Sequence, residues 1–152
     1  MKLATGTDSD AGTMIAVLSP AKTLDLATPP PFPATPARFA AEAAVLAKAA
    51  SHLTQKKLAE LMHISPTLAK LNADRFRDFD TAAERPALYT FAGDVYAGLE
   101  AATLDAEAVR FAQGHLRLLS GLYGLLRPLD AMRPYRLEMG TRWAPRRRKL
   151  TD

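Results

Sequence analysis

The sequence contains no cysteine, and it has no apolar run long enough to cross a bilayer. Without cysteine there is no disulfide, thiolate metal site or cysteine nucleophile, which fits a reducing cytoplasm. Histidine is scarce, and His52, His63 and His115 share no metal-ligand spacing. A Walker loop, a Gly-x-Ser-x-Gly elbow and a dinucleotide fingerprint are also missing. We therefore expect a cytoplasmic protein without a resident metal, cofactor or membrane partner, and motif chemistry alone names no reaction.

The composition is that of a soluble globular chain. Its 152 residues are 48% apolar and 24% charged, which is enough for one domain with a core. Residues 1–13 are polar and lack periodicity, so we predict a flexible leader there and one domain over 14–152. Met14, which opens the first apolar run, is an alternative start of the protein.

Positive charge is concentrated near the C-terminal end. Residues 1–109 hold 10 Lys and Arg against 13 Asp and Glu, a net of −3, whereas residues 110–152 hold 10 against 3, a net of +7. Such asymmetry suggests a polyanionic partner such as nucleic acid. A solvated basic face, with partner acids elsewhere in a longer protein, explains the charges equally well.

The apolar pattern predicts a mixed α/β or α+β fold with several helices around a small mixed sheet. The expected strands are a buried one at 14–18 and others at 87–91, 116–120 and 135–139. The expected helices cover 36–51, 95–100 and 106–115, and two more begin at Thr54 and at Ser65-Pro66. On the third helix the expected apolar face is Leu68, Leu71 and Phe76.

The turn Ser19-Pro20-Ala21-Lys22-Thr23-Leu24-Asp25 follows the first expected strand. Ligand groups commonly lie at the carboxyl ends of strands in α/β proteins. Ser19, Lys22 and Thr23 offer hydroxyls and an ammonium suited to an anion. The same pattern fits an ordinary Ser-Pro turn with a solvated lysine, and spacing alone favours that interpretation.

Residues 58–69 are a candidate helix-hairpin-helix, in which backbone amides of a tight turn bind DNA phosphate. Ile64 fits the central apolar position and Ser65 the second small position. His63 stands where glycine is usual, and a left-handed conformation there is strained. Lysines and an arginine suited to a phosphate backbone lie nearby, namely Lys56, Lys57, Lys70 and Arg75. A plain helical hairpin in the core explains the pattern equally well.

The region 117–142 interleaves arginines with aromatic residues, a combination suited to phosphate and stacked bases. Glu138 and Arg136 are two residues apart, so in a strand both side chains lie on one face. They would hold a substrate beside a cleft or form a structural ion pair, which is the commoner outcome. The candidate binding residues here are Arg117, Arg127, Arg133, Arg136 and Glu138.

Another carboxylate, Asp94, follows Phe91-Ala92-Gly93 and precedes a short expected helix. We expect it to cap that helix, because aspartate is favoured at this position. A ligand-binding role is the alternative.

Several segments, in this order, resemble the YaaA family of peroxide-stress proteins, also called UPF0246. They are LSPAKTLD at 18–25, LAELMHISPTLAKLNADRF at 58–76, FAGDVYAGL at 91–99 and LRLLSGLYGLLRPLDAMRPYRLEMGT at 116–141. The resemblance implies a cytosolic bacterial protein that limits iron-driven oxidative damage to DNA. It also implies a basic cleft lined by Lys22, Arg136 and Glu138, and DNA-phosphate contacts from the hairpin 58–76.

The chain departs from the family pattern in three ways. Residues 1–13 have no recognised counterpart, Ala92 stands where the family often has lysine, and family members continue past the equivalent of Asp152. By this resemblance the chain is the N-terminal part of a YaaA-like domain, so we expect apolar surface that is normally covered to lie exposed.

The resemblance leads us to expect non-specific DNA binding rather than catalysis. The alternative is an enzyme acting on a small anionic or nucleotide-like substrate in the same cleft, held by Lys22 with Arg136 and Glu138 orienting it or exchanging a proton. Iron binding is a third possibility, which the lack of cysteine and clustered histidine argues against. The sequence leaves the oligomeric state open.

Overall fold

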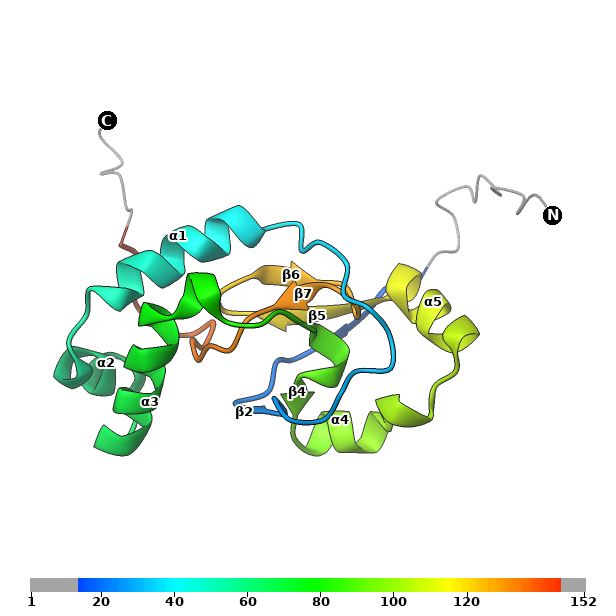
Figure 1. Ribbon diagram of the computed structural model, residues 1–152, viewed down its shortest axis with the longest axis horizontal. Helices are drawn as coiled ribbons and strands as arrows, with labels where there is room; N and C mark the ends of the chain where they lie inside the picture. Colours follow the sequence, from blue (N-terminus) through cyan, green and yellow to red (C-terminus); the bar gives the residue numbers. More distant parts are fainter. Residues whose placement is uncertain (1–13, 146–152) are drawn as a thin grey trace.

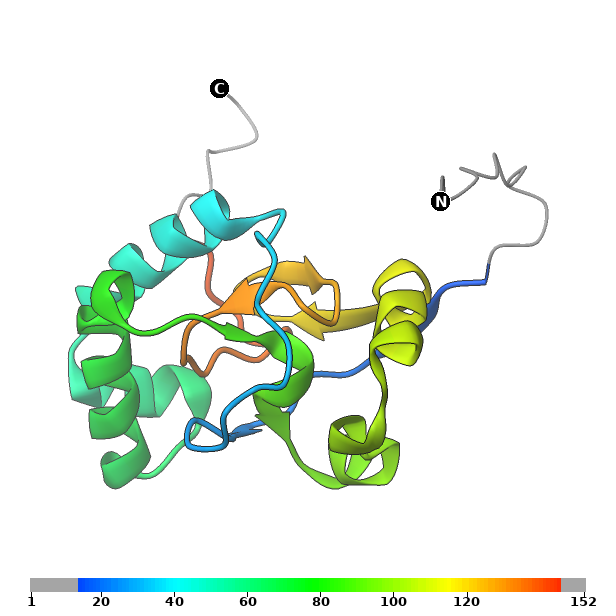
Figure 2. The same ribbon diagram turned by 45° about the vertical axis from the view of Figure 1, so that its right-hand side comes forward.

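The computed structural model describes residues 14–145; the expected leader 1–13 and the basic run 146–149 lie outside the described residues. Three helices gather at one end of the molecule and two at the other, with short strands between them (Figures 1 and 2). No helix within residues 14–145 is both long and apolar enough to span a bilayer. The α-helices are α1 (Ala40–Ser51), α2 (Gln55–Met62), α3 (Pro66–Arg77), α4 (Asp94–Leu99) and α5 (Ala106–His115).

A three-stranded mixed sheet lies at the centre and confirms the predicted α/β class. Its middle strand is β5 (Leu116–Ser120), which pairs in parallel with β1 (Ala16–Leu18) and antiparallel with β6 (Gly124–Leu126). Two short antiparallel ladders accompany it. They join β2 (Thr23–Leu24) to β4 (Phe91–Ala92) and β3 (Arg85–Pro86) to β7 (Ala131–Met132).

The predicted starts of α2 and α3 rest on observed caps. The Thr54 hydroxyl accepts a hydrogen bond from the Lys57 amide at 3.1 Å, and the Ser65 hydroxyl accepts one from the Leu68 amide at 3.2 Å. Each cap satisfies an amide that has no partner inside its helix. Helix α1 starts only at Ala40, after a turn at residues 38–39, which is later than the predicted residue 36.

The predicted apolar face of α3 is partly wrong. Leu71 is 43% exposed, whereas Ala69, Asn72 and Phe76 are buried. Helix α3 packs against α1, whose buried residues are alanines, so the small side chains set which side of α3 faces inward. The face is therefore fixed by the neighbouring helix rather than by the largest apolar side chains of α3.

Two predicted strands are absent from the described part of the chain. Residues 87–91 form a 3₁₀ turn, Ala87–Tyr89, followed by β4, because the amides of Ala87 and Leu88 donate to the carbonyls of Asp130 and Pro128. Residues 135–139 have no partner strand. Their burial still alternates, with Tyr135 and Leu137 inside, so the pattern correctly predicted the faces but not the ladder.

The predicted strand at 14–18 exists, but it is not buried. Met14 is 82% exposed and Val17 53% exposed. Within residues 14–145 β1 has one neighbouring strand, β5. The residues after β1 connect it to the turn that carries Lys22.

Gly121, directly after β5, holds the segment around Leu137 in place. A Cβ at residue 121 would lie 1.9 Å from the Leu137 carbonyl oxygen and 2.8 Å from its carbonyl carbon. Both atoms belong to the backbone, so a side chain at residue 121 requires the segment to move. Glycine is therefore needed there to seat the residues that carry Arg136 and Glu138.

We predict that Gly121→Ala lowers the free energy of unfolding by about 1–3 kcal/mol, the usual range for overpacking a tight contact. Urea denaturation followed by far-UV circular dichroism measures the change. Gly114→Ala is the matched control, because a Cβ at this position in α5 meets nothing within 4 Å. The control should be neutral or slightly stabilising. Equal stability of the two variants would contradict the packing role of Gly121.

Candidate anion-binding cleft

Three segments that are far apart in the sequence line one continuous hollow surface. One depression of about 260 Å³ lies between the turn Pro20–Lys22 and the segment 135–140. A second, of about 410 Å³, lies between residues 60–63 at the end of α2 and the segment 138–142. Both depressions are lined by Glu138 and Gly140. We call this combined surface the cleft.

A single carboxylate links the two predicted cations of the cleft. Glu138 Oε1 lies 3.0 Å from Lys22 Nζ and 3.8 Å from Arg136 Nη2. Arg136 and Glu138 therefore share a face, as predicted, although no ladder is present. Because the carboxylate and the lysine are at least half exposed, this pairing contributes little to stability.

Positive charge exceeds what Glu138 balances. Burial, and then repulsion from Arg136, lowers the pKa of Arg75. The Arg136 side chain is only 17% exposed, and its buried Nε has no hydrogen-bond partner among the described residues. Two guanidinium groups held close together and partly out of water are the arrangement that an oxyanion stabilises.

Buried tyrosines fix the walls of the cleft. Tyr135 is hydrogen-bonded to the Ser120 hydroxyl, and burial raises the pKa of this tyrosine well above its usual value. Tyr96 donates its hydroxyl to the Ser19 carbonyl at 2.7 Å, and burial raises the pKa of Tyr96 to about 12. Both hydroxyls thus remain protonated near neutral pH and anchor the two sides of the first depression.

The hairpin between α2 and α3 forms one end of the cleft. His63 adopts the left-handed conformation, with φ 54° and ψ 49°. This is the conformation that is strained for a residue other than glycine. Ile64 packs against the core, and Ser65 caps α3. The structure thus contains two packed helices joined by a tight turn.

The hairpin lysines lie on the outer surface. Lys57 is 4.0 Å from Glu60, and Lys70 is 3.0 Å from Asp74, both pairs being exposed. Lys56 is also exposed. None of these lysines lines the two depressions.

Other predicted site residues lie away from the cleft. Arg133 pairs with Glu84 at 3.3 Å, and Arg127 pairs with the buried Asp130 at 2.9 Å. Arg117 and Arg127 line a separate hollow with Leu125. Ser19 and Thr23 do not line the cleft either, although they flank its turn. Of the predicted set, Lys22, Arg136 and Glu138 are brought together; Arg75 is near enough to Arg136 for their charges to repel, but it lines neither depression.

The predicted capping role of Asp94 is wrong. Helix α4 has Gly93 as its N-cap, and no side chain bonds there. Gly93 has φ 150°, which favours glycine, and its α-carbon faces the Ala21 side chain. The motif thus places α4 against the cleft turn rather than supplying a cap.

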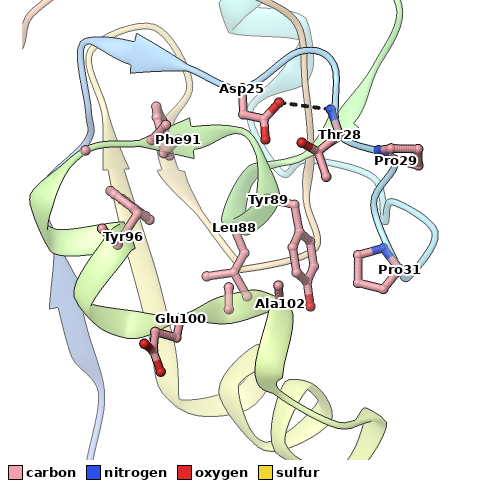
Figure 3. Close-up of a pocket in the computed structure, with 14 residues that line it drawn as sticks. Asp25, Thr28, Pro29, Pro31, Leu88, Tyr89, Phe91, Tyr96, Glu100 and Ala102 are labelled. Atoms are coloured by element: carbon pink, nitrogen blue, oxygen red, sulfur yellow. Dashed lines mark hydrogen bonds between the residues drawn. The ribbon is translucent and has the colours of Figure 1, made fainter.

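Sequence reasoning missed a further pocket, of about 330 Å³, lined by residues 25–31 after β2 and by residues 88–102 around β4 and α4 (Figure 3). It is lined mainly by apolar groups, with Asp25 at one side and Glu100 at another. Asp25 accepts hydrogen bonds from the amides of Ala27 and Thr28, so its carboxylate stabilises a turn. The buried Tyr89 hydroxyl has no partner among the described residues. The motif at 91–99 supplies part of its lining, but the sequence analysis connected that motif with helix capping and not with a pocket.

No group of three or more potential metal ligands comes together within residues 14–145. The fold and the cleft thus define the class: an α/β protein whose cleft is lined by Lys22, Arg136 and Arg142 together with the carboxylates of Glu60 and Glu138. The family model described as peroxide stress protein YaaA matches residues 14–152. The chain therefore belongs to the YaaA family of peroxide stress proteins, which supports a role in peroxide stress.

The relatives of this chain belong to the same family but are longer than the chain. The UPF0246 protein of Rhizorhabdus wittichii is 64% identical over 137 residues, which is 90% of this chain and 54% of that protein. The UPF0246 protein of a Jannaschia species is 57% identical over 141 residues, covering 88% of this chain and 52% of that protein. The chain thus spans about half the length of the curated relatives it matches.

The cleft geometry predicts that Glu138 competes with a bound anion. Glu138→Gln should change the free energy of unfolding by less than about 1 kcal/mol, because the pair is exposed. It should also increase the rise in melting temperature caused by phosphate, because the cations lose their carboxylate. Differential scanning fluorimetry with and without phosphate measures both effects.

The matched control is Glu84→Gln. Glu84 is 51% exposed and Glu138 50% exposed, and each pairs with an arginine, but Glu84 lies away from the cleft. An equal phosphate response in the two variants would mean that the ion pair at Glu138 is purely structural.

Proposed function

We propose that the chain acts in the peroxide stress response by binding the phosphate backbone of DNA without strong sequence choice. The observation that carries the proposal is that the exposed Lys22 and the largely buried Arg136 share one carboxylate, Glu138, while Arg75 lies near enough to Arg136 for their charges to repel. Phosphate contacts supply most of the affinity in non-specific binding, and they require no base-reading groups. Bound DNA would be shielded from iron-driven oxidation, the damage that family resemblance connects with this role.

The hairpin is the second element of the proposal. Helix α3 begins next to the cleft, and amides at a helix start favour an anion. In this proposal the α2–α3 turn acts as a helix-hairpin-helix, with Ile64 anchoring it in the core. Lys56, Lys57 and Lys70 then contact neighbouring phosphates, while the cleft holds the central one.

A small anionic or nucleotide-like ligand is the second candidate, and catalysis on it the further possibility. The first depression, about 260 Å³, is concave and has a lysine, an arginine and a carboxylate at its rim. That arrangement suits a compact anion as well as a backbone phosphate. Turnover of a nucleotide substrate that Lys22→Ala abolishes while the fold stays intact would favour this candidate over DNA binding.

DNA binding by the cleft predicts a steep dependence on salt, because each phosphate contact releases counterions. Fluorescence anisotropy with a short duplex at several salt concentrations gives the slope of log affinity against log salt. The double change Lys22→Gln and Arg142→Gln should reduce that slope by about two. Both residues are exposed, so the fold should persist.

Lys48→Gln is the control for this experiment. Lys48 is an exposed lysine in the last turn of α1 that does not line the cleft. Absence of measurable duplex binding, or a slope unchanged in the double variant, would contradict the role of the cleft in DNA binding.

The hairpin is tested separately by changing Lys56, Lys57 and Lys70 together to glutamine. If each contacts one phosphate, affinity should fall and the salt slope should decrease by about two to three. The same anisotropy titration measures it, with melting temperature as a check on folding. Unchanged binding would remove the hairpin from the account and leave the cleft alone.

A further inference from the structure

The outer face of the β1–β5–β6 sheet carries apolar side chains around one arginine and is partly open to solvent. Paired residues of neighbouring strands present their side chains on the same face, and so do alternate residues of one strand. The register therefore places Val17 beside Arg117, and Leu119 beside Leu125, on one side of the sheet. Val17 is 53% and Leu125 39% exposed, and Leu119 lies outside the core cluster.

The opposite face of the same sheet packs mainly against the core. Leu118, Ser120 and Leu126 are buried, and Leu18 and Leu116 pack against the core. Parallel strands are normally covered on both faces, so a parallel pair with one bare face is unusual. Within residues 14–145 the second edge of β1 also has no partner strand, which leaves backbone groups available for pairing.

The bare face has a characteristic charge. Beside it, a hollow of about 460 Å³ is lined by Arg38, Arg117, Arg127, Leu125 and Asp130. Asp130 is buried, and its carboxylate accepts hydrogen bonds from Arg127 and from the Thr35 hydroxyl. The Asp130 carboxylate therefore balances the charge of Arg127 alone. Arg38 and Arg117 keep the surface around the apolar residues basic. An element that covers this face needs apolar side chains flanked by carboxylates.

The lengths of the relatives indicate where such an element comes from. The Rhizorhabdus wittichii relative matches 90% of this chain, but that match accounts for only 54% of the relative. Nearly half of a closely similar protein is thus polypeptide with no counterpart here. A strand from that half could pair with the free edge of β1, and a strand or helix from it could cover the outer face of the β1–β5–β6 sheet.

We propose that the outer face of the β1–β5–β6 sheet is the docking surface for the polypeptide that full-length relatives have outside the matched region, which the family resemblance places after it. An acidic, amphipathic part of that polypeptide covers Val17, Leu119 and Leu125. Another part of it extends the sheet along the free edge of β1. The interaction is independent of the DNA-binding proposal, because the cleft does not include these residues.

Co-expression tests the docking directly. The tagged chain is produced together with the untagged segment of the Rhizorhabdus wittichii relative that follows its match, and a one-to-one complex should co-purify. Val17→Glu and Leu125→Glu should each weaken the complex at least tenfold in a titration of the purified components. Both residues are exposed, so the fold tolerates the changes.

Leu71→Glu is the matched control, since Leu71 is 43% exposed, close to the 39% of Leu125, but lies on α3. It should leave the complex unchanged. No complex, or a complex that the two sheet variants bind as tightly as the unchanged chain, would overturn the proposal. Self-association of the chain that Leu125→Glu abolishes would assign the face to a second copy, and loss of DNA binding in the same variant would assign it to nucleic acid; either result overturns the proposal.

A fused form gives a second measurement that does not depend on the solubility of the separate segment. The segment of the relative is joined after Asp152, and hydrogen exchange at Ile15–Leu18 is compared with that of the chain alone. Exchange should slow at least tenfold in the fusion, because the edge of β1 becomes paired. Unchanged exchange in a folded fusion would overturn the proposal.

Discussion

The parallel pairing of β1 with β5 is the contact on which the arrangement of the cleft depends. It aligns Ala16 with Leu116, residues a hundred positions apart, so two distant chain segments leave the sheet at the same edge. One of them continues into the turn that carries Lys22. The other reaches Gly121, whose missing side chain admits the Leu137 carbonyl. Lys22 and Glu138 meet at 3.0 Å because both segments start from this pairing.

Charge and burial have separate roles around that pairing. Tyr96 and Tyr135 fix the walls of the cleft through their buried hydroxyls, and those hydroxyls stay neutral near pH 7. The cations lie on the resulting frame with one shared carboxylate between them. Stability therefore depends mainly on apolar contacts and neutral hydrogen bonds, while the exposed ion pairs remain free to exchange partners with an anion.

Local signals predicted the starts of α2 and α3, because the caps Thr54 and Ser65 need only a few neighbouring residues. They also predicted that Arg136 and Glu138 share a face. They missed the later start of α1. They failed where the outcome depends on distant chain, as for Leu71, whose exposure is decided by the alanines of α1. The ion pair of Arg127 could have been predicted from the local sequence, because Asp130, three residues later, binds its guanidinium. The pocket at Tyr89 and Glu100 was missed because its lining combines residues 25–31 with residues 88–102, which are far apart in the sequence.

The long separation between β1 and β5 also shapes how the protein is made. A nascent chain presents β1 first and must wait for about a hundred further residues before its partner leaves the ribosome. The contacts among α1, α2 and α3 lie within residues 40–77 and become available much earlier. Helical structure thus has time to form before the sheet, and the apolar residues of β1 stay unpaired until β5 has been made.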